Sequence, residues 1–281
     1  MTTATAPSKP GRVAASLPQT ARDILVITRR NILRNLRLPQ LIVLSTIQPI
    51  MFLLLFTYVF GGAIGGSLPA AAGGEYINWL IPGLLVQTAV FGAGQTALGL
   101  TEDLSKGVID RFRSLPMARS AVLAGRAFSD LIRNGFVITL MLVVGVLIGF
   151  RYQTSFAGLI AGLALAMVFS FGFSWIMATI GLIVKNPEAA QTAVFLPVFP
   201  LVFASSVFVP IQTMPSWLRT FAEHQPVTVA VDALRGLILG EGALLPGQTV
   251  EGRVLLSLFW SGLILAVFVP LAVRVYRRTV N

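Results

Sequence analysis

The charged side chains that could take part in binding or chemistry are concentrated in one short stretch of the first half of the chain. Acidic and basic residues are interspersed there, and the stretch ends at Leu115-Pro116, where proline disfavours helix at the residue before it. The charged residues are Glu102, Asp103, Lys106, Asp110, Arg111 and Arg113. A short, stiff helix of mixed charge is suited to docking in a groove of a soluble protein. The alternative is a solvated loop whose charges only fix the topology.

The residues that most catalytic or metal sites need are missing from the sequence. It contains no cysteine, and its single histidine, His224, excludes a metal site that needs two histidines. Neither a G-x-x-x-x-G-K-[ST] phosphate loop nor an H-E-x-x-H or nucleophile-elbow motif occurs. We therefore expect no catalytic residue, no metal and no cofactor in this chain.

Uncharged stretches make up most of the remaining sequence. Each is about long enough for a helix, which rises about 1.5 Å per residue, to cross a hydrocarbon core about 30 Å thick. They cover residues 41–61, 77–100, 134–150, 156–184, 189–209 and 254–273. This pattern predicts an all-α integral membrane protein with six transmembrane helices. Because no stretch contains an ionisable residue, the energy for any transport must come from outside the chain.

The net charge of +10 is distributed unevenly along the chain. With a cytoplasmic N-terminus, all but four of the 21 Lys and Arg residues lie on the cytoplasmic side; the exceptions are Arg151, Arg219, Arg235 and Arg253. This positive-inside bias predicts that both termini are cytoplasmic. It also explains the basic balance without a nucleic-acid partner. The excess of Arg over Lys, with many Ala, Val and Gly residues, indicates a bacterial source and thus a bacterial cell membrane.

The chain divides into a tail, a lead-in helix and a membrane domain. Residues 1–18 have no hydrophobic periodicity and are rich in Ala, Thr, Ser and Pro, which predicts a flexible cytoplasmic tail. Residues 19–38 form an amphipathic pattern that favours a helix in the cytoplasmic interface. Its basic residues include Arg29, Arg30, Arg34 and Arg37. This helix either only anchors the first span or also contacts a cytoplasmic partner. Residues 39–281 then form the six-span domain.

The long connection before the last span, residues 210–253, is predicted to be external and half-buried. Pro215 and Trp217 stand at the start of a short helix, with the Trp at interface depth. A second amphipathic helix follows Pro226, and within it Asp232 and Arg235 are three residues apart and able to pair. The two helices either form a re-entrant hairpin at the outer mouth or lie flat as an interfacial cap.

Three motifs in combination point to one family. They are the run Arg111-Phe112-Arg113-Ser114-Leu115-Pro116-Met117, the turn Lys185-Asn186-Pro187-Glu188, and the pattern Met214-Pro215-x-Trp217 … Gln225-Pro226 … Asp232-Ala233-Leu234-Arg235-Gly236. With the amphipathic lead-in and the six spans, the chain resembles the type-2 ABC exporter permeases over essentially its whole length. The resemblance is to the daunorubicin-resistance-type multidrug branch in particular.

The resemblance implies a permease subunit that forms a homodimer and recruits two separate ABC ATPase subunits, which bind Mg-ATP. Glu102, Gly107 and Leu115-Pro116 match the coupling segment of the family, although Asp103 and Leu104 stand where alanines are expected. In the family the two short helices before the last span are external and re-entrant. Its substrates include hydrophobic drugs, antibiotics, lipids and polysaccharide precursors.

We therefore expect the non-catalytic membrane subunit of an ATP-driven exporter that moves a hydrophobic or amphipathic molecule outward. The 102–116 helix and the interface helix would convert closure of the ATPases into tilting of the spans. One alternative is an ion-gradient-driven drug transporter, which the missing intramembrane carboxylate disfavours. Another is a membrane-embedded lipid-modifying enzyme, for which only the dispersed Glu223, His224 and Asp232 are available.

Overall fold

The computed structural model describes residues 17–37, 39–64, 75–108 and 119–279. Every regular element in these ranges is helical, which confirms the predicted all-α class. The elements in chain order are α1 (Leu17–Arg37), α2 (Pro39–Leu55), the π-helix η1 (Phe56–Phe60), α3 (Gly61–Ile64), α4 (Tyr76–Ser105), α6 (Arg119–Leu147), α7 (Phe156–Val184), α8 (Pro187–Phe203), the 3-10 helix η4 (Ile211–Thr213), α9 (Ser216–His224), α10 (Pro226–Leu239), the 3-10 helix η5 (Glu241–Ala243) and α11 (Val250–Thr279).

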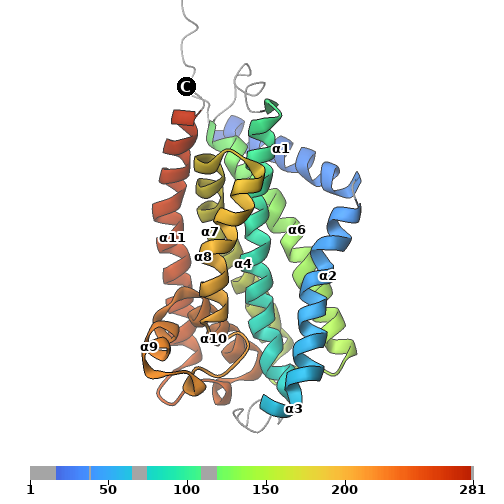
Figure 1. Cartoon of the computed structure of the whole chain (residues 1–281), viewed down its shortest axis with the longest axis vertical. Coiled ribbons are helices and arrows are strands. Elements are labelled where there is room, and N and C mark those ends of the chain that lie inside the picture. Colours follow the sequence, from blue (N-terminus) through green and yellow to red (C-terminus); the bar gives the residue numbers. More distant parts are fainter. Residues whose placement is uncertain (1–16, 38, 65–74, 109–118, 280–281) are drawn as a thin grey trace, which may run out of the picture.

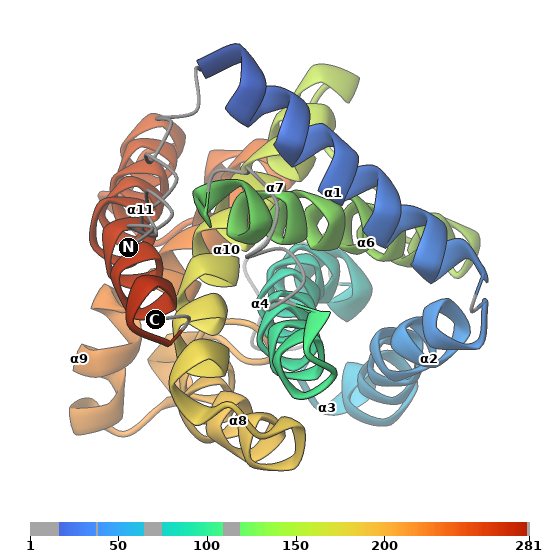
Figure 2. The same cartoon turned by 90° about the horizontal axis from the view of Figure 1, so that it is seen from above.

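The long helices form a bundle whose two ends are built differently. Helices α2, α4, α6, α7, α8 and α11 run along the long axis of the molecule and alternate in direction along the chain (Figure 1). Helix α1 lies across the end at which α4 finishes and α6 begins, and the C-terminus is at the same end (Figures 1 and 2). Helices α9 and α10 lie at the opposite end. The basic lead-in and the long connection before α11 therefore occupy opposite ends of the bundle.

Several helices are long and apolar enough to cross a membrane, so the chain is a multi-pass membrane protein. Four described helices qualify by length and composition: Tyr76–Ser105, Ala121–Leu147, Phe156–Val184 and Val250–Arg278. The other two predicted spans correspond to shorter apolar helices, Ser45–Phe60 and Pro187–Phe203.

The helix that contains most of the third predicted span, 134–150, begins well before that span and ends at Leu147. Helix α6 starts at Arg119, and its first turns carry Arg126, Asp130 and Arg133. The helix that holds this predicted span therefore also carries a paired carboxylate ahead of it. Hydropathy misses this part of the helix because the charges are paired within the fold, and such pairing is not visible in a window of sequence.

The fifth predicted span, 189–209, ends earlier than expected. Asn186 caps α8 by accepting hydrogen bonds from the first turn, and Pro187 occupies the first helical position. The helix stops at Phe203, and the apolar residues that follow turn back toward α10. Their backbone carbonyls are needed there as hydrogen-bond acceptors, so continued apolar sequence does not continue the helix.

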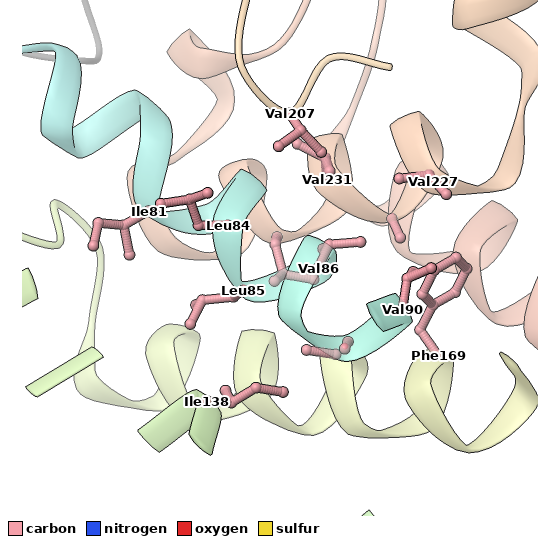
Figure 3. Packing of buried hydrophobic residues seen from close by; sticks show 14 of the residues in the cluster. Ile81, Leu84, Leu85, Val86, Val90, Ile138, Phe169, Val207, Val227 and Val231 are labelled. Carbon is pink, nitrogen blue, oxygen red and sulfur yellow. The ribbon is translucent and has the colours of Figure 1, made fainter. Parts of the chain in front are cut away.

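Helix α4 is the centre of the bundle. Of its apolar window 89% is buried, against 17% for α11 at the periphery. It packs against α2, α6, α7, α8 and α10. Figure 3 shows Leu85 and Val86 of α4 among Ile138 of α6, Phe169 of α7 and Val231 of α10. A displacement of α4 must therefore disturb the packing of most of the other helices.

Glycines of α7 permit its close approach to two neighbours. A Cβ atom at Gly181 would lie 2.7 Å from the backbone oxygen of Ala97 in α4, and one at Gly158 would lie 2.5 Å from that of Leu237 in α10. A Cβ at Gly162 would meet Ile238 at 3.1 Å. The small-residue spacing of Gly158 and Gly162 thus serves contacts within one chain, as expected for helices packed without a strong hydrophobic driving force.

Large apolar side chains cover the outside of the bundle. Examples are Leu255 and Phe259 of α11, Leu196 of α8, Met51 of α2 and Phe136 of α6, all of which are more than half exposed. A water-soluble protein does not expose apolar residues over several neighbouring helices. The exposed face of each helix is the one that the lipid would cover.

Helix α10 is buried on all sides rather than on one face. Val231 and Leu234 on one face are fully buried, but so are Val229 and Ala233 on other faces. Helices α4, α7 and α11 surround it. Helix α9 is different, because its Trp217 is 74% exposed. The half-buried pair of helices predicted here is in fact one enclosed helix and one surface helix.

Arg235 is the largest fully buried side chain and joins α10 to its neighbours. Its guanidinium lies 3.4 Å from the ring centroid of Trp79. It donates hydrogen bonds to the carbonyls of Ser206 at 2.6 Å and Trp79 at 3.3 Å. The predicted pair with Asp232 is present, with 3.7 Å between Nη1 and Oδ1, and Arg253 approaches the same carboxylate to 4.0 Å. One buried cation thus holds α4, α10 and the turn after α8 together.

Replacing Arg235 with Ala is expected to destabilise the protein by about 3–5 kcal/mol, because it leaves the buried Asp232 carboxylate without its main partner. Thermal unfolding of the purified protein in detergent measures this loss. Arg219→Ala is the control, since it breaks an exposed pair with Glu223 and should cost about 1 kcal/mol or less. In the double variant Asp232→Ala/Arg235→Ala the loss of unfolding free energy should be smaller than the sum of the losses in the two single variants. Additive losses would show that the pair carries no coupling energy.

Candidate functional site

Ion pairs fasten α1 to the end of α4. Arg34 hydrogen-bonds Glu102 and lies 3.6 Å from Asp103, both in the last turns of α4. Arg30 lies 3.5 Å from the other carboxylate oxygen of Asp103. Lys106, the C-cap of α4, lies 3.7 Å from Glu102. These pairs are linked through shared residues, and the carboxylate of Asp103 is nearly buried. Such a network contributes more to folding stability than an isolated surface pair does.

The amphipathic pattern of α1 explains how the helix lies on the bundle. Ile27 and Asn31 are buried on the side that packs against α6. The Thr28 hydroxyl lies 2.8 Å from the Ile24 carbonyl of its own helix and 3.2 Å from the Gly125 carbonyl of α6.

Leu25 and Leu36, on the opposite side of the helix from Arg30 and Arg34, are 69% and 62% exposed. Arg30 and Arg34 are therefore used within the chain, and the apolar side points away from the bundle. This is the arrangement of a helix at a membrane surface.

The structure describes only part of the predicted coupling segment. Glu102 and Asp103 belong to α4 and face α1, whereas Gly107, with φ of +65°, lies in the turn after the helix. The other predicted residues lie outside the described residues; they are Asp110, Arg111, Arg113, Leu115 and Pro116. The segment therefore begins directly at the ion-pair network.

A second group of charges in α6 was not predicted as a site. Asp130 accepts a hydrogen bond from Arg126 Nε at 2.9 Å and another from the Thr96 hydroxyl of α4 at 2.9 Å. Arg133 Nε lies 3.9 Å from the same carboxylate. The side chains of Arg126 and Arg133 are each only 12% exposed. Their spacing of four and three residues within a helical pattern is the sequence signal that could have revealed them.

The remaining predicted residues are spread over both ends of the molecule. At the α1 end, Arg29 and Arg37 are exposed. At the other end, Pro215 precedes α9 as its N-cap residue, and Pro226 opens α10 after the Gln225 cap. Asp232 and Arg235 form the buried centre described above, and Trp217 is on the surface. The predicted external residues are thus not gathered into one site.

The charged groups at the α1 end form two sets of ion pairs. Among the residues that the structure describes, no group of three or more His, Cys, Asp or Glu side chains is placed to hold a metal. One set joins α1 to α4, and the other lies within α6.

Comparison with known proteins identifies the family. The family model described as ABC-2 type transporter matches residues 22–239. The chain is 36% identical over 231 residues to the daunorubicin resistance ABC transporter permease protein DrrB1 of Streptomyces coeruleorubidus, covering 82% of this chain and 77% of the relative. It is 25% identical over 235 residues to a probable doxorubicin resistance permease, DrrC, of Mycobacterium tuberculosis, with 84% and 82% covered. With most of its length matched, this permease belongs to the ABC-2 type transporter family.

Proposed function

We propose that the chain is the membrane subunit of an ATP-driven exporter in a bacterial cell membrane, and that a separate ATPase docks at the α1 end. The observation that carries this proposal is the network of Arg30, Arg34, Glu102 and Asp103, which lies where the chain enters the predicted coupling segment. Membership of the ABC-2 type family supports a partner that supplies the energy. A homodimer with two ATPases is the assembly that we expect.

The structure suggests how motion at this end reaches the opposite one. Helix α1 is tied to the last turns of α4, and α4 packs against α10 within the bundle. Near the start of α4, the Trp79 carbonyl and ring hold Arg235 of α10. Helix α4 thus connects the proposed ATPase end with the enclosed α10. We propose that tilting α4 moves α10 and opens or closes an outer gate.

The distribution of basic residues supports the orientation. Lys106, Lys185 and Arg277 lie at the end of α4, after α7 and near the end of α11, all at the end of the bundle that carries α1. By the positive-inside rule this end is cytoplasmic. Six crossings, which include the shorter helices α2 and α8, then place both termini in the cytoplasm and α9 and α10 outside.

The cargo that we propose is a hydrophobic or amphipathic molecule. The printed names of the two relatives connect them with daunorubicin and doxorubicin resistance. An ion-gradient mechanism is less well supported, although Asp130 and Asp232 are buried carboxylates. Each lies beside an arginine, so neither is an isolated proton carrier of the kind that such transporters place in the membrane.

The energy source is tested by reconstitution. Vesicles that contain the permease together with an ATPase of the same operon should accumulate a fluorescent anthracycline against its gradient only when Mg-ATP is supplied on the ATPase side. Vesicles with the permease alone should show no uphill movement, with or without a pH gradient. Uphill transport by the permease alone, driven by a pH gradient, would overturn the proposal and favour an ion-driven transporter.

The mechanical role of the network is tested by reversing its charges. Arg34→Glu places like charges together at the end of α4, so ATP-driven transport should fall by about tenfold, the size of a typical coupling energy between sites. The double variant Arg34→Glu/Glu102→Arg restores opposite charges and should recover much of the rate. Arg22→Glu, an exposed change on the same helix, is the matched control. Equal losses for Arg34→Glu and Arg22→Glu would exclude a specific role for the pair.

A further inference from the structure

A cavity of about 290 Å³ lies between α2, α4 and α6 at the α1 end of the bundle. Three arginines and two carboxylates line it: Arg34, Arg126, Arg133, Glu102 and Asp130. A smaller cavity of about 80 Å³ shares Ser45, Gln48, Gln95 and Arg133 with the first. The two are therefore neighbouring parts of one cleft, and Arg133 stands where they meet.

The carboxylates of this cleft already have close partners. Of the three arginines, Arg133 makes the longest contact with a carboxylate. Glu102 is paired with Arg34 and with Lys106. Asp130 takes short hydrogen bonds from Arg126 and a threonine hydroxyl, which leaves Arg133 a contact of 3.9 Å. Among the described residues it donates a hydrogen bond to a backbone carbonyl, that of Gly92, at 3.2 Å. A nearly buried guanidinium with so little neutralisation favours an additional anion.

The smaller cavity is suited to the apolar part of a ligand. Phe52 of α2, Phe91 of α4 and Val137 of α6 line it, together with the amides of Gln87 and Asn134. The cleft is thus charged near the end of the bundle, and the described residues that line its continuation carry no charge beyond Arg133 and include these apolar side chains. An amphiphile in a membrane has the same polarity, with its head at the surface and its tail toward the centre.

We propose that this cleft binds the anionic oxygen headgroup, a phosphate or a carboxylate, of an amphiphile from the cytoplasmic leaflet. Arg133 and Arg126 would hold the headgroup through charge-assisted, fork-like hydrogen bonds, which guanidinium groups make well with such oxygens. The hydrocarbon part would lie against Phe52 and Phe91. Since binding needs only the permease, this inference is tested without the ATPase and independently of the proposed transport.

The test uses the delipidated full-length permease in detergent and native mass spectrometry. A phosphatidylglycerol and a phosphatidylcholine with the same chains are titrated in parallel, and inorganic phosphate is the arm without a tail. We expect phosphatidylglycerol to bind about tenfold more tightly than phosphatidylcholine, which is the effect of one charge-assisted hydrogen bond. If phosphate competes with the anionic lipid, the anion alone suffices; if it does not, the site requires the lipid. Both results support the proposal.

Arg133→Gln removes the charge but keeps a donor for the Gly92 carbonyl, and it should abolish the preference for the anionic lipid. Arg133→Lys should retain part of that preference. Arg277→Gln, the same change at an exposed position of α11, is the matched control and should bind as the unmodified protein does. Elution as a single folded species by size-exclusion chromatography is checked for each variant.

A second variant covers the case in which Arg133→Gln does not fold. Gln48 lines both cavities and is accessible, so Gln48→Glu adds a negative charge to the cleft without emptying a buried site. It should weaken binding of the anionic lipid by about tenfold. Gln40→Glu makes the same change on α2 away from the cleft. Equal affinity of the unmodified protein for both lipids, or a preference that survives Gln48→Glu and Arg133→Gln, would overturn the proposal.

Discussion

A charge that is removed from water must find its partners within the protein, and this requirement organises the structure at both ends. At one end Arg235 is fully buried and draws a tryptophan, a carboxylate and the carbonyls after α8 around itself. At the other end Asp130 is shared between two arginines of its own helix. In each case the helix that carries the buried charge, α10 or α6, is held where that charge has its partners. A shift of the helix would leave the charge buried and unpaired.

Helix α4 connects these two charged centres. Its last turns hold the arginines of α1, and its first turns supply the ring and carbonyl that hold Arg235. It is also the most enclosed of the four helices long enough to span a membrane. A helix in this position cannot move alone, because close-packed neighbours respond to its displacement. This position is the basis of the proposal that a movement imposed at the α1 end reaches the opposite end.

The cleft between α2, α4 and α6 adds a binding role to the same end. It lies beside the network that ties α1 to α4, and Arg34 and Glu102 contribute to both. An amphiphile bound there would contact the helices that the ATPase is proposed to move. Binding and force transmission would then share residues, so occupancy of the cleft would affect the energy needed to tilt α4.

The sequence by itself determined the helical class, the membrane environment and the extents of helices such as α7, because these follow from the length of uncharged stretches. Its motifs indicated the family. It also indicated the Asp232–Arg235 pair through its spacing. Only the tertiary structure decided that α6 extends through Arg126, Asp130 and Arg133, that α8 stops at Phe203, and that α10 is enclosed. Hydropathy counts each charge as exposed, whereas its cost depends on partners from distant segments, and only the folded chain brings those partners together.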